Sequence, residues 1–250
     1  MAISIKDIEK KVFSGERITE EEALYLFRSD DLLTIGELAH YSARKKNGDY
    51  VYFVVNRHIN PSNICVNRCR FCAFSKDKGD HGAYTLTIDE IIERTRQAKD
   101  LGATEIHIVG GLHPDLPYEF YVEMLREIKR EFPSVHLQAF TAVEIDYFSR
   151  ISGKSVEDVL LELKDAGLGS LPGGGAEIFE ERIRKRICPE KITGERWLEI
   201  MRKAHTLGIR SNATMLYGHL EDYESRVHHL SLLRKIHGLM VQTIQQPLMI

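Results

Sequence analysis

The chain has 250 residues, of which 43% are hydrophobic, and a formal net charge of −3. This length allows one sizeable domain with a full core, and the charge gives no reason to expect nucleic-acid binding. Charges interrupt the apolar residues near the start, which excludes a secretory signal, and no apolar run approaches the roughly 18 residues of a membrane helix. We therefore expect a cytoplasmic protein that does not enter a membrane.

Residues 1–48 have the pattern of a helical extension. Thr19 is followed by three glutamates, which is a favourable helix start. A second helix start lies at 34–37, and the glycine that closes the segment 45–48 ends that helix. We expect residues 1–48 to form an N-terminal helical extension and residues 49–250 to form the main α/β domain.

From Tyr50 onward, predicted strands alternate with predicted helices. Strands are expected at 52–59, 105–109, 135–140, 168–171 and 209–217, and helices at 87–102, 118–132, 155–166, 197–208 and 223–236. This alternation predicts a parallel sheet with right-handed crossovers. The cysteines and the glycine pairs come directly after strands, where a (β/α) barrel carries its catalytic residues.

The length does not fit a complete barrel. About 200 residues follow residue 48, and each strand–helix unit takes roughly 30 or more. The chain therefore supplies five clear strands and at best a sixth, within 240–250. We expect an incomplete α/β fold of the TIM-barrel type, whose last units are missing or whose open edge is closed by another chain.

Cys65, Cys69 and Cys72 are three of only four cysteines and have the spacing C-x3-C-x2-C. Thiolates this close in sequence suit a soft metal or an iron–sulfur cluster, and three ligands leave one cluster iron open. A structural zinc site would need a fourth ligand, from His58, His81 or a distant residue. Three clustered cysteines cannot all pair in disulfides, so a disulfide is not expected here. The distant Cys188 is expected to be a packing residue.

These features together resemble the radical S-adenosylmethionine (SAM) superfamily: the cysteine loop with Phe71 before its last cysteine, Gly110-Gly111 after the second strand, and the strand–helix order. Longer runs at 57–65, 140–144, 171–178 and 212–221 resemble the menaquinone futalosine-pathway branch. The run 212–221 is more similar to aminofutalosine synthases than to their sister enzymes, the cyclic dehypoxanthinylfutalosine synthases; the deazaflavin-forming F420 enzymes are more distant. The resemblance extends to about His237, and it implies a C-terminally truncated chain.

The resemblance implies a transferase of menaquinone biosynthesis with a 4Fe–4S cluster and SAM consumed as co-substrate. SAM would be cleaved to methionine and a 5′-deoxyadenosyl radical, which would add to the enol-ether double bond of 3-(1-carboxyvinyloxy)benzoate. Aryl migration and loss of the carboxylate as hydrogencarbonate would then give 6-amino-6-deoxyfutalosine. A reductant such as flavodoxin or ferredoxin would supply the electron. The alternatives are the sister activity, a truncated and inert cluster-binding remnant, and a zinc-binding module.

By the same resemblance, Cys65, Cys69 and Cys72 would ligate three irons, with SAM on the fourth, and Phe71 would lie beside the adenine. Gly110 and Gly111 would let backbone carbonyls approach the SAM amino group. The run 173–175 would leave room for the ribose.

Four further predictions concern polar residues. Glu177 is a candidate acceptor for the sugar hydroxyls or a helix cap. His219 is expected at the end of the fifth strand. There it would donate a hydrogen bond to a substrate carboxylate, shuttle a proton, or have only a structural role. Asn56, His58 and Asn60 alternate along the first strand and can line the floor of the site. The two carboxylates of the substrate favour an arginine, for which Arg57 and Arg210 are candidates whose facing the sequence leaves open.

Overall fold

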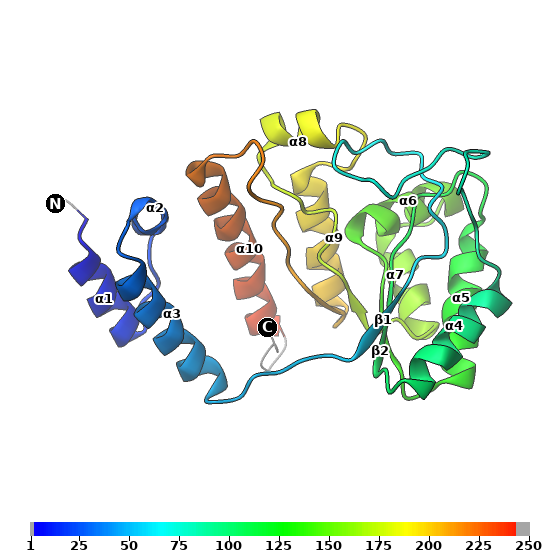
Figure 1. The fold of residues 1–250 in the computed structure, drawn as a ribbon, viewed down its shortest axis with the longest axis horizontal. Helices are drawn as coiled ribbons and strands as arrows, with labels where there is room; N and C mark the ends of the chain where they lie inside the picture. The colour runs from blue at the N-terminus through cyan, green and yellow to red at the C-terminus, as the bar shows by residue number, and fades with distance from the viewer. Residues whose placement is uncertain (1–2, 244–250) are drawn as a thin grey trace.

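The computed structural model describes residues 3–243, which form a parallel sheet with helices on its flanks (Figure 1). The sheet order is β1-β2-β3-β4-β5, so each strand pairs with the next one along the chain. The strands are β1 (Asn56–Ile59), β2 (Glu105–Ile108), β3 (His136–Ala139), β4 (Ser170–Leu171) and β5 (Arg210–Ser211). This arrangement is a partial (β/α) barrel and confirms the predicted fold class.

Helices precede the sheet and follow its strands. The first three, α1 (Ile5–Ser14), α2 (Glu20–Arg28) and α3 (Leu32–Asn47), come before β1. The others are α4 (Ile88–Asp100), α5 (Tyr118–Glu131), α6 (Ala142–Ser152), α7 (Val156–Asp165), α8 (Glu181–Ile187), α9 (Gly194–Thr206) and α10 (Tyr223–Thr243). Among the described residues, no helix is both long and apolar enough to cross a membrane.

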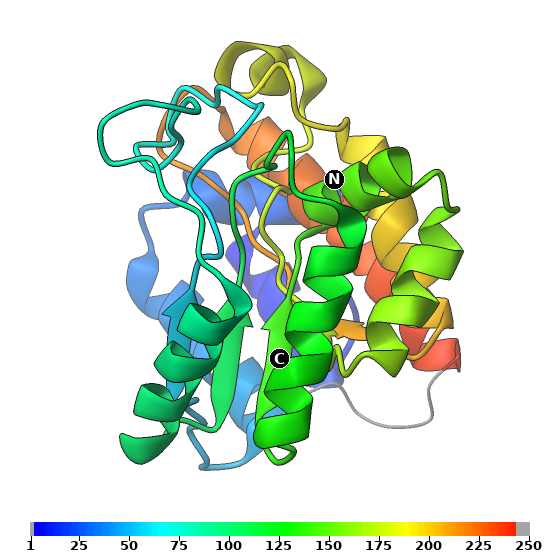
Figure 2. The ribbon, with the colours of Figure 1, turned by 90° about the vertical axis from the view of Figure 1, so that its right-hand side faces the viewer.

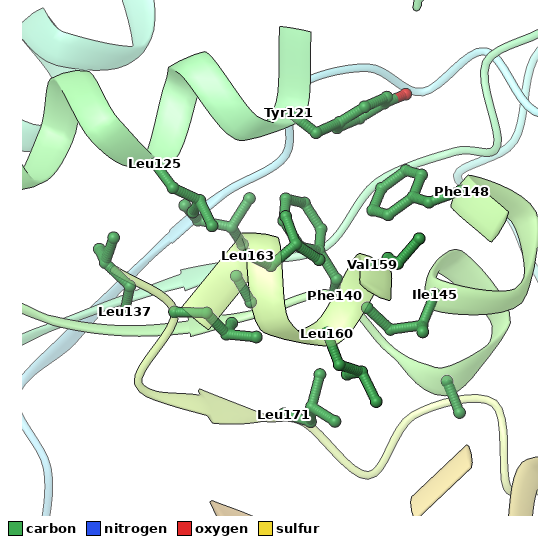
Figure 3. Close-up of a cluster of buried hydrophobic side chains, with 14 of the residues drawn as sticks. Tyr121, Leu125, Leu137, Phe140, Ile145, Phe148, Val159, Leu160, Leu163 and Leu171 are labelled. Atoms are coloured by element: carbon green, nitrogen blue, oxygen red, sulfur yellow. The ribbon is translucent and has the colours of Figure 1, made fainter. Parts of the chain in front are cut away.

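The core lies between the sheet and the helices that follow its strands. Ile106, Leu137 and Leu171 alternate with polar residues along their strands and are fully buried. Figure 3 shows Leu137 and Leu171 beside leucines from α5 and α7 and beside aromatic rings from α5 and α6. One face of the sheet is therefore apolar and covered, and it fixes the register that positions the loops.

Local capping signals place the helices. Thr19, Thr87 and Thr141 each form a complete capping box with the glutamate three residues later. The predicted helix starts at Thr19 and Thr87 are confirmed. The helix after Thr141 was not predicted, because the run 140–144 was interpreted only as part of a family pattern.

All five predicted strands are longer than the observed ones, and the difference is large for the first and the fifth. The segment 52–59 forms a strand only from Asn56, because Tyr52 and Phe53 are 69% and 86% exposed and pair with no strand. The segment 209–217 forms only the two-residue strand β5, after which the chain leaves the sheet. Of the suggested sixth strand at 240–250, residues 240–243 belong to α10, and 244–250 lie outside the described residues.

The first three helices lie to one side of the sheet, and α10 stands between them and α9 (Figure 1). Phe27 on α2 stacks on Tyr223 of α10 with ring centroids 5.6 Å apart. Arg28 pairs with Glu224, and Arg234 donates to the Ile18 carbonyl at 2.9 Å. The division of the chain at residue 48 stays a prediction.

Candidate active site

The three clustered cysteines surround one cavity beyond the carboxyl ends of β1 and β2. The loops after the strands gather at this end of the sheet (Figure 2). The cavity has a volume of about 150 Å³, and its lining includes Cys65, Cys69, Cys72, Phe71, Gly110, Gly111, Glu144, Gly175 and Lys191. The structure therefore brings together the predicted cluster ligands, the predicted aromatic and the predicted glycine pair.

Backbone hydrogen bonds hold the cysteine loop in place. The Cys65 N–H donates to the Lys76 carbonyl at 3.2 Å, and the Val66 N–H donates to the Leu112 carbonyl at 3.0 Å. The Arg70 N–H donates to the Ile187 carbonyl at 2.8 Å, which ties the loop to α8. The loop is thus fixed on both sides of the cavity.

The three thiols have different surroundings. The Cys65 sulfur accepts from the Leu112 and Asn67 N–H groups at 3.3 and 3.4 Å. Burial raises the pKa of Cys69 to about 11, so metal binding must release its proton. Cys72 is exposed. Cys188 is buried with Ile183 and Ile187 beside Cys69, in agreement with a packing role.

The donor set fits an iron–sulfur cluster held by three thiolates. All four cysteines are free, so no disulfide competes for the thiols. Within residues 3–243, no three His, Cys, Asp or Glu side chains converge on the position of a single metal ion. The three thiols instead line one shared cavity, as ligands of separate corner irons do. The zinc alternative gains no support from the described residues.

The glycine pair packs directly against the cysteine loop. A Cβ on Gly111 would lie 2.1 Å from the Ile64 carbonyl oxygen and 3.0 Å from the Cys65 Cβ. A Cβ on Gly110 would lie 3.2 Å from the Ser62 carbonyl oxygen. Gly111 is therefore required for the loop to approach β2, a reason that the sequence did not reveal.

Glu144 is a site residue that sequence reasoning did not assign. Its carboxylate accepts from the Thr141 N–H at 2.7 Å, from the Thr141 hydroxyl at 2.9 Å and from the Gly110 N–H at 3.0 Å. Burial raises its pKa from 4.5 to about 7, although these hydrogen bonds oppose the shift. The local pattern indicates a capping box, and only the tertiary contact with Gly110 links it to the cavity.

This pKa predicts a pH-dependent stability of the apoprotein. Between pH 4.5 and 7 the folded state keeps a proton on Glu144 that the unfolded chain releases, so the free energy of unfolding falls as the pH rises. The contribution is at most about 3 kcal/mol. Denaturant unfolding of wild type and Glu144→Gln across this range will give a steeper fall for the wild type. Equal slopes would contradict the assigned pKa.

Lys191 is a second unassigned residue in the lining. Its Nζ lies 2.5 Å from the Glu177 carboxylate and 5.2 Å from the centre of the Phe71 ring. Burial alone lowers the Lys191 pKa, but the adjacent Glu177 carboxylate and the nearby Cys69 and Cys188 together raise it. Lys191 is therefore a buried cation beside the cavity. Glu177 is linked to the site by its ion pair with Lys191. The backbone of Glu177 lies in the left-handed region, at φ 47°.

Arg184 fixes the loops that carry these two residues. Its buried guanidinium donates to the carbonyls of Gly175, Ala176, Ile178 and Ile192 at 2.5–3.2 Å. The Gly175 and Lys191 loops are thereby held together on one side of the cavity. Nothing in the sequence pattern marked Arg184 for this role.

His219 lies elsewhere, contrary to its expected position at a strand end. Because β5 ends at Ser211, His219 sits in a loop, where its Nε2 lies 3.1 Å from the Leu216 carbonyl and its Nδ1 lies 3.5 Å from Glu221. The residues that line the cysteine cavity do not include His219, Asn56, His58 or Asn60. The catalytic role of His219 stays a prediction that its position does not favour.

Comparison with known proteins places the chain in a class. The Radical SAM superfamily profile matches residues 59–233. The chain therefore belongs to the radical SAM superfamily, whose enzymes use a 4Fe–4S cluster and SAM as co-substrate. The crystal structure of methylornithine synthase has the same fold, with a TM-score of 0.71 and 20% identity over 93% of this chain and 65% of that one.

Two relatives with different names are similar to this chain. An aminodeoxyfutalosine synthase from Streptomyces coelicolor is 47% identical over 92% of this chain and 60% of that protein. A 5-amino-6-(D-ribitylamino)uracil–L-tyrosine 4-hydroxyphenyl transferase from Methanopyrus kandleri is 48% identical over 79% of this chain and 54% of that protein. The chain thus spans 60% or less of the length of either relative.

Proposed function

We propose that the protein is a transferase of menaquinone biosynthesis that joins the 5′-deoxyadenosyl group of SAM to 3-(1-carboxyvinyloxy)benzoate. Methionine leaves from SAM, the aryl group migrates, one carboxylate is lost as hydrogencarbonate, and the product is 6-amino-6-deoxyfutalosine. The observation that carries the radical SAM chemistry is the single cavity shared by three cysteine thiols and closed by no fourth thiol among the described residues. The particular reaction is supported by the 47% identity to the Streptomyces coelicolor synthase. A cytoplasmic reductant such as flavodoxin or ferredoxin fits this chemistry.

In this proposal Cys65, Cys69 and Cys72 hold the cluster, and the Leu112 N–H donates to the Cys65 sulfur. The bound cluster supplies the electron for SAM cleavage. The Cys69 thiol must lose its proton for the site to load, since burial favours its neutral form. Cys72 is the exposed one of the three thiols.

The cavity's own charges suit the ends of SAM. Glu144 and Lys191 line the cavity, and Glu177 pairs with Lys191 beside it. SAM has a sulfonium, an ammonium and a carboxylate, so its amino acid end calls for both an acceptor and a cationic donor. We propose that Lys191 faces the SAM carboxylate and that Glu144, held by Gly110 and Thr141, faces the positive groups.

Phe71 and Glu177 complete this arrangement. The Phe71 ring lines the cavity and is 43% exposed, so one face is available to stack on the adenine. Glu177 is held at 2.5 Å by Lys191 and is proposed to accept from the ribose hydroxyls. The Glu177 side chain is thus fixed by Lys191 and not by capping the following helix.

Two other activities compete with this one. The tyrosine-using transferase is favoured by the 48% identity to the Methanopyrus kandleri protein, although over a shorter part of the chain. The cyclic dehypoxanthinylfutalosine synthase activity, in which SAM only abstracts hydrogen, is opposed by the run 212–221. A substrate-swap assay separates all three.

The assay uses anaerobically reconstituted protein, SAM and a chemical reductant, with product identification by mass spectrometry. We expect 6-amino-6-deoxyfutalosine from the enol-ether substrate and no product from dehypoxanthine futalosine or from tyrosine with 5-amino-6-(D-ribitylamino)uracil. Product from either of the last two, with none from the enol ether, would overturn the proposed reaction. A bound cluster with neither SAM cleavage nor any product would support the inert-remnant alternative.

A further inference from the structure

The cysteine loop reaches the protein surface at Cys72, the exposed one of its three thiols. Two apolar residues of the same loop, Val66 and Phe74, are also exposed. A protein that approaches Cys72 would therefore meet a partly apolar surface. The charges around such a surface decide which partner fits it.

Helix α8 lies directly beside this loop. The Arg70 N–H donates to the Ile187 carbonyl at 2.8 Å, which joins the segment between Cys69 and Cys72 to the last residue of α8. Ile187 also packs with Cys69 in one buried cluster. Both views show α8 next to the loop that follows β1 (Figures 1 and 2). The C-terminal end of α8 is therefore surface next to a predicted cluster ligand.

This part of the molecule is basic, although the chain has a formal net charge of −3. Helix α8 contains four basic residues and one acidic residue, and the segment 65–74 contains two arginines and no acidic residue. Arg184 is buried, whereas Arg70, Lys185 and Arg186 are exposed. The last turn of α8 and the adjacent loop thus present three cations to solvent.

These three cations have no partner in the protein. Arg182 and Arg68 lie nearby, and each pairs with an aspartate. By contrast, the side chains of Arg70, Lys185 and Arg186 form no hydrogen bond and no ion pair within the part of the chain that the structure describes. Exposed cations without partners are common on proteins, so their position beside Cys69 carries the argument.

The carboxylates of the same region are already engaged. Glu181 accepts from the Gly194 N–H at 2.8 Å, and Glu190 accepts from the Arg68 N–H at 3.4 Å. Lys185 and Arg186 also do not belong to the lining of the cysteine cavity. Their charges are therefore available to a partner outside the molecule, and the complementary partner is acidic.

We propose that Arg70, Lys185 and Arg186 form the docking surface for an acidic one-electron carrier protein, which reduces the cluster from this side. The carrier loses one electron and the cluster gains it, and no atom or proton is transferred. This assignment rests on the proposed radical SAM function, and it names the contact surface of the reductant. It does not depend on which second substrate the enzyme uses.

The test compares the double variant Lys185→Glu/Arg186→Glu with wild type, and an acidic flavodoxin is the probe. Calorimetry gives the Kd for flavodoxin at an ionic strength of about 0.03 M, where surface charges are weakly screened. Methionine release from SAM is measured with limiting reduced flavodoxin and, in parallel, with excess dithionite. We expect the Kd to rise about tenfold or more and the flavodoxin-driven rate to fall similarly. Iron content and the dithionite-driven rate should not change.

Lys45→Glu/Lys46→Glu is the matched control, because it reverses two adjacent cations in the last turn of another helix. That helix is α3, which lies away from α8 in both views (Figures 1 and 2). The control has the same net charge as the test variant, but its Kd should stay within about twofold of wild type. Raising the ionic strength to about 0.5 M should weaken wild-type binding and reduce the difference between the proteins.

Two milder variants distinguish lost charge from a damaged helix. Lys185→Arg/Arg186→Lys keeps both charges and should bind flavodoxin as wild type does. Lys185→Gln/Arg186→Gln should raise the Kd about threefold, and it replaces the charge reversal if that variant loses iron.

Equal losses of flavodoxin affinity in the α8 and α3 variants would overturn this docking surface, and so would unchanged affinity in both. A wild type that cleaves SAM with dithionite but does not bind flavodoxin would overturn it as well. A wild type that holds a cluster and cleaves no SAM even with dithionite would contradict the proposed function instead. In that case the Kd values of the variants would still test the docking surface.

Discussion

Replacing Cys65, Cys69 or Cys72 with alanine is expected to abolish SAM cleavage and to leave a folded protein without a complete 4Fe–4S cluster. Each residue contributes one of three thiols around a single cavity, and the described residues offer no fourth thiol there. A cluster with two thiolate ligands would lose iron or convert to a smaller form. Iron and sulfide content, visible absorbance and methionine release after anaerobic reconstitution measure this effect.

Cys188→Ala is the matched control, because it removes the fourth cysteine from the same neighbourhood. Cys188 packs with Ile183 and Ile187 beside Cys69 but does not line the cavity. The variant should keep its cluster and its SAM cleavage, with a modest loss of stability of about 1 kcal/mol. A loss of iron in Cys188→Ala equal to that in Cys69→Ala would contradict the three-cysteine assignment.

Gly111→Ala is expected to have the second-largest effect, although it adds only one methyl group. Its Cβ would lie 2.1 Å from the Ile64 carbonyl oxygen, so the loop must move away from β2 by more than a normal side-chain adjustment. Such overpacking costs about 3 kcal/mol. Because Cys65 directly follows Ile64, the displacement moves a cluster ligand, and we expect most of the reconstituted iron to be lost.

Gly36→Ala controls for the general effect of adding a methyl group to a glycine. Gly36 lies in α3, where an added Cβ would meet no atom within 4 Å. Alanine is favoured over glycine in a helix, so the variant should be unchanged or more stable by about 0.5–1 kcal/mol. Thermal unfolding and iron content are compared for both variants. Full iron loading of Gly111→Ala would refute the close-packing argument.

The parts of the site that could be predicted from the sequence are those encoded by adjacent residues. The spacing of Cys65, Cys69 and Cys72 indicates a cluster by itself, and Gly110-Gly111 follows a strand that the apolar pattern marks clearly. The capping boxes at Thr19 and Thr87 are likewise local, since both hydrogen bonds join residues three apart. Such local features can be predicted because they do not depend on contacts with distant segments.

The rest depends on contacts between distant segments. Lys191 follows α8 without any motif, and it joins the site because Arg184 binds the carbonyls of Gly175 and Ile192. Glu144 reaches Gly110 across 34 residues of sequence. The early end of β5, which displaced His219 from its expected position, depends on where the chain stops pairing with β4. Local periodicity contains none of this information.

The central claim is that three cysteines hold a cluster whose remaining iron is open to SAM. The most direct measurement is the electron paramagnetic resonance spectrum of the anaerobically reconstituted, reduced protein with and without SAM. We expect the signal of a reduced 4Fe–4S cluster that changes on SAM addition and disappears in Cys65→Ala. A cluster signal that SAM leaves unchanged, or a colourless protein with stoichiometric zinc, would contradict the claim.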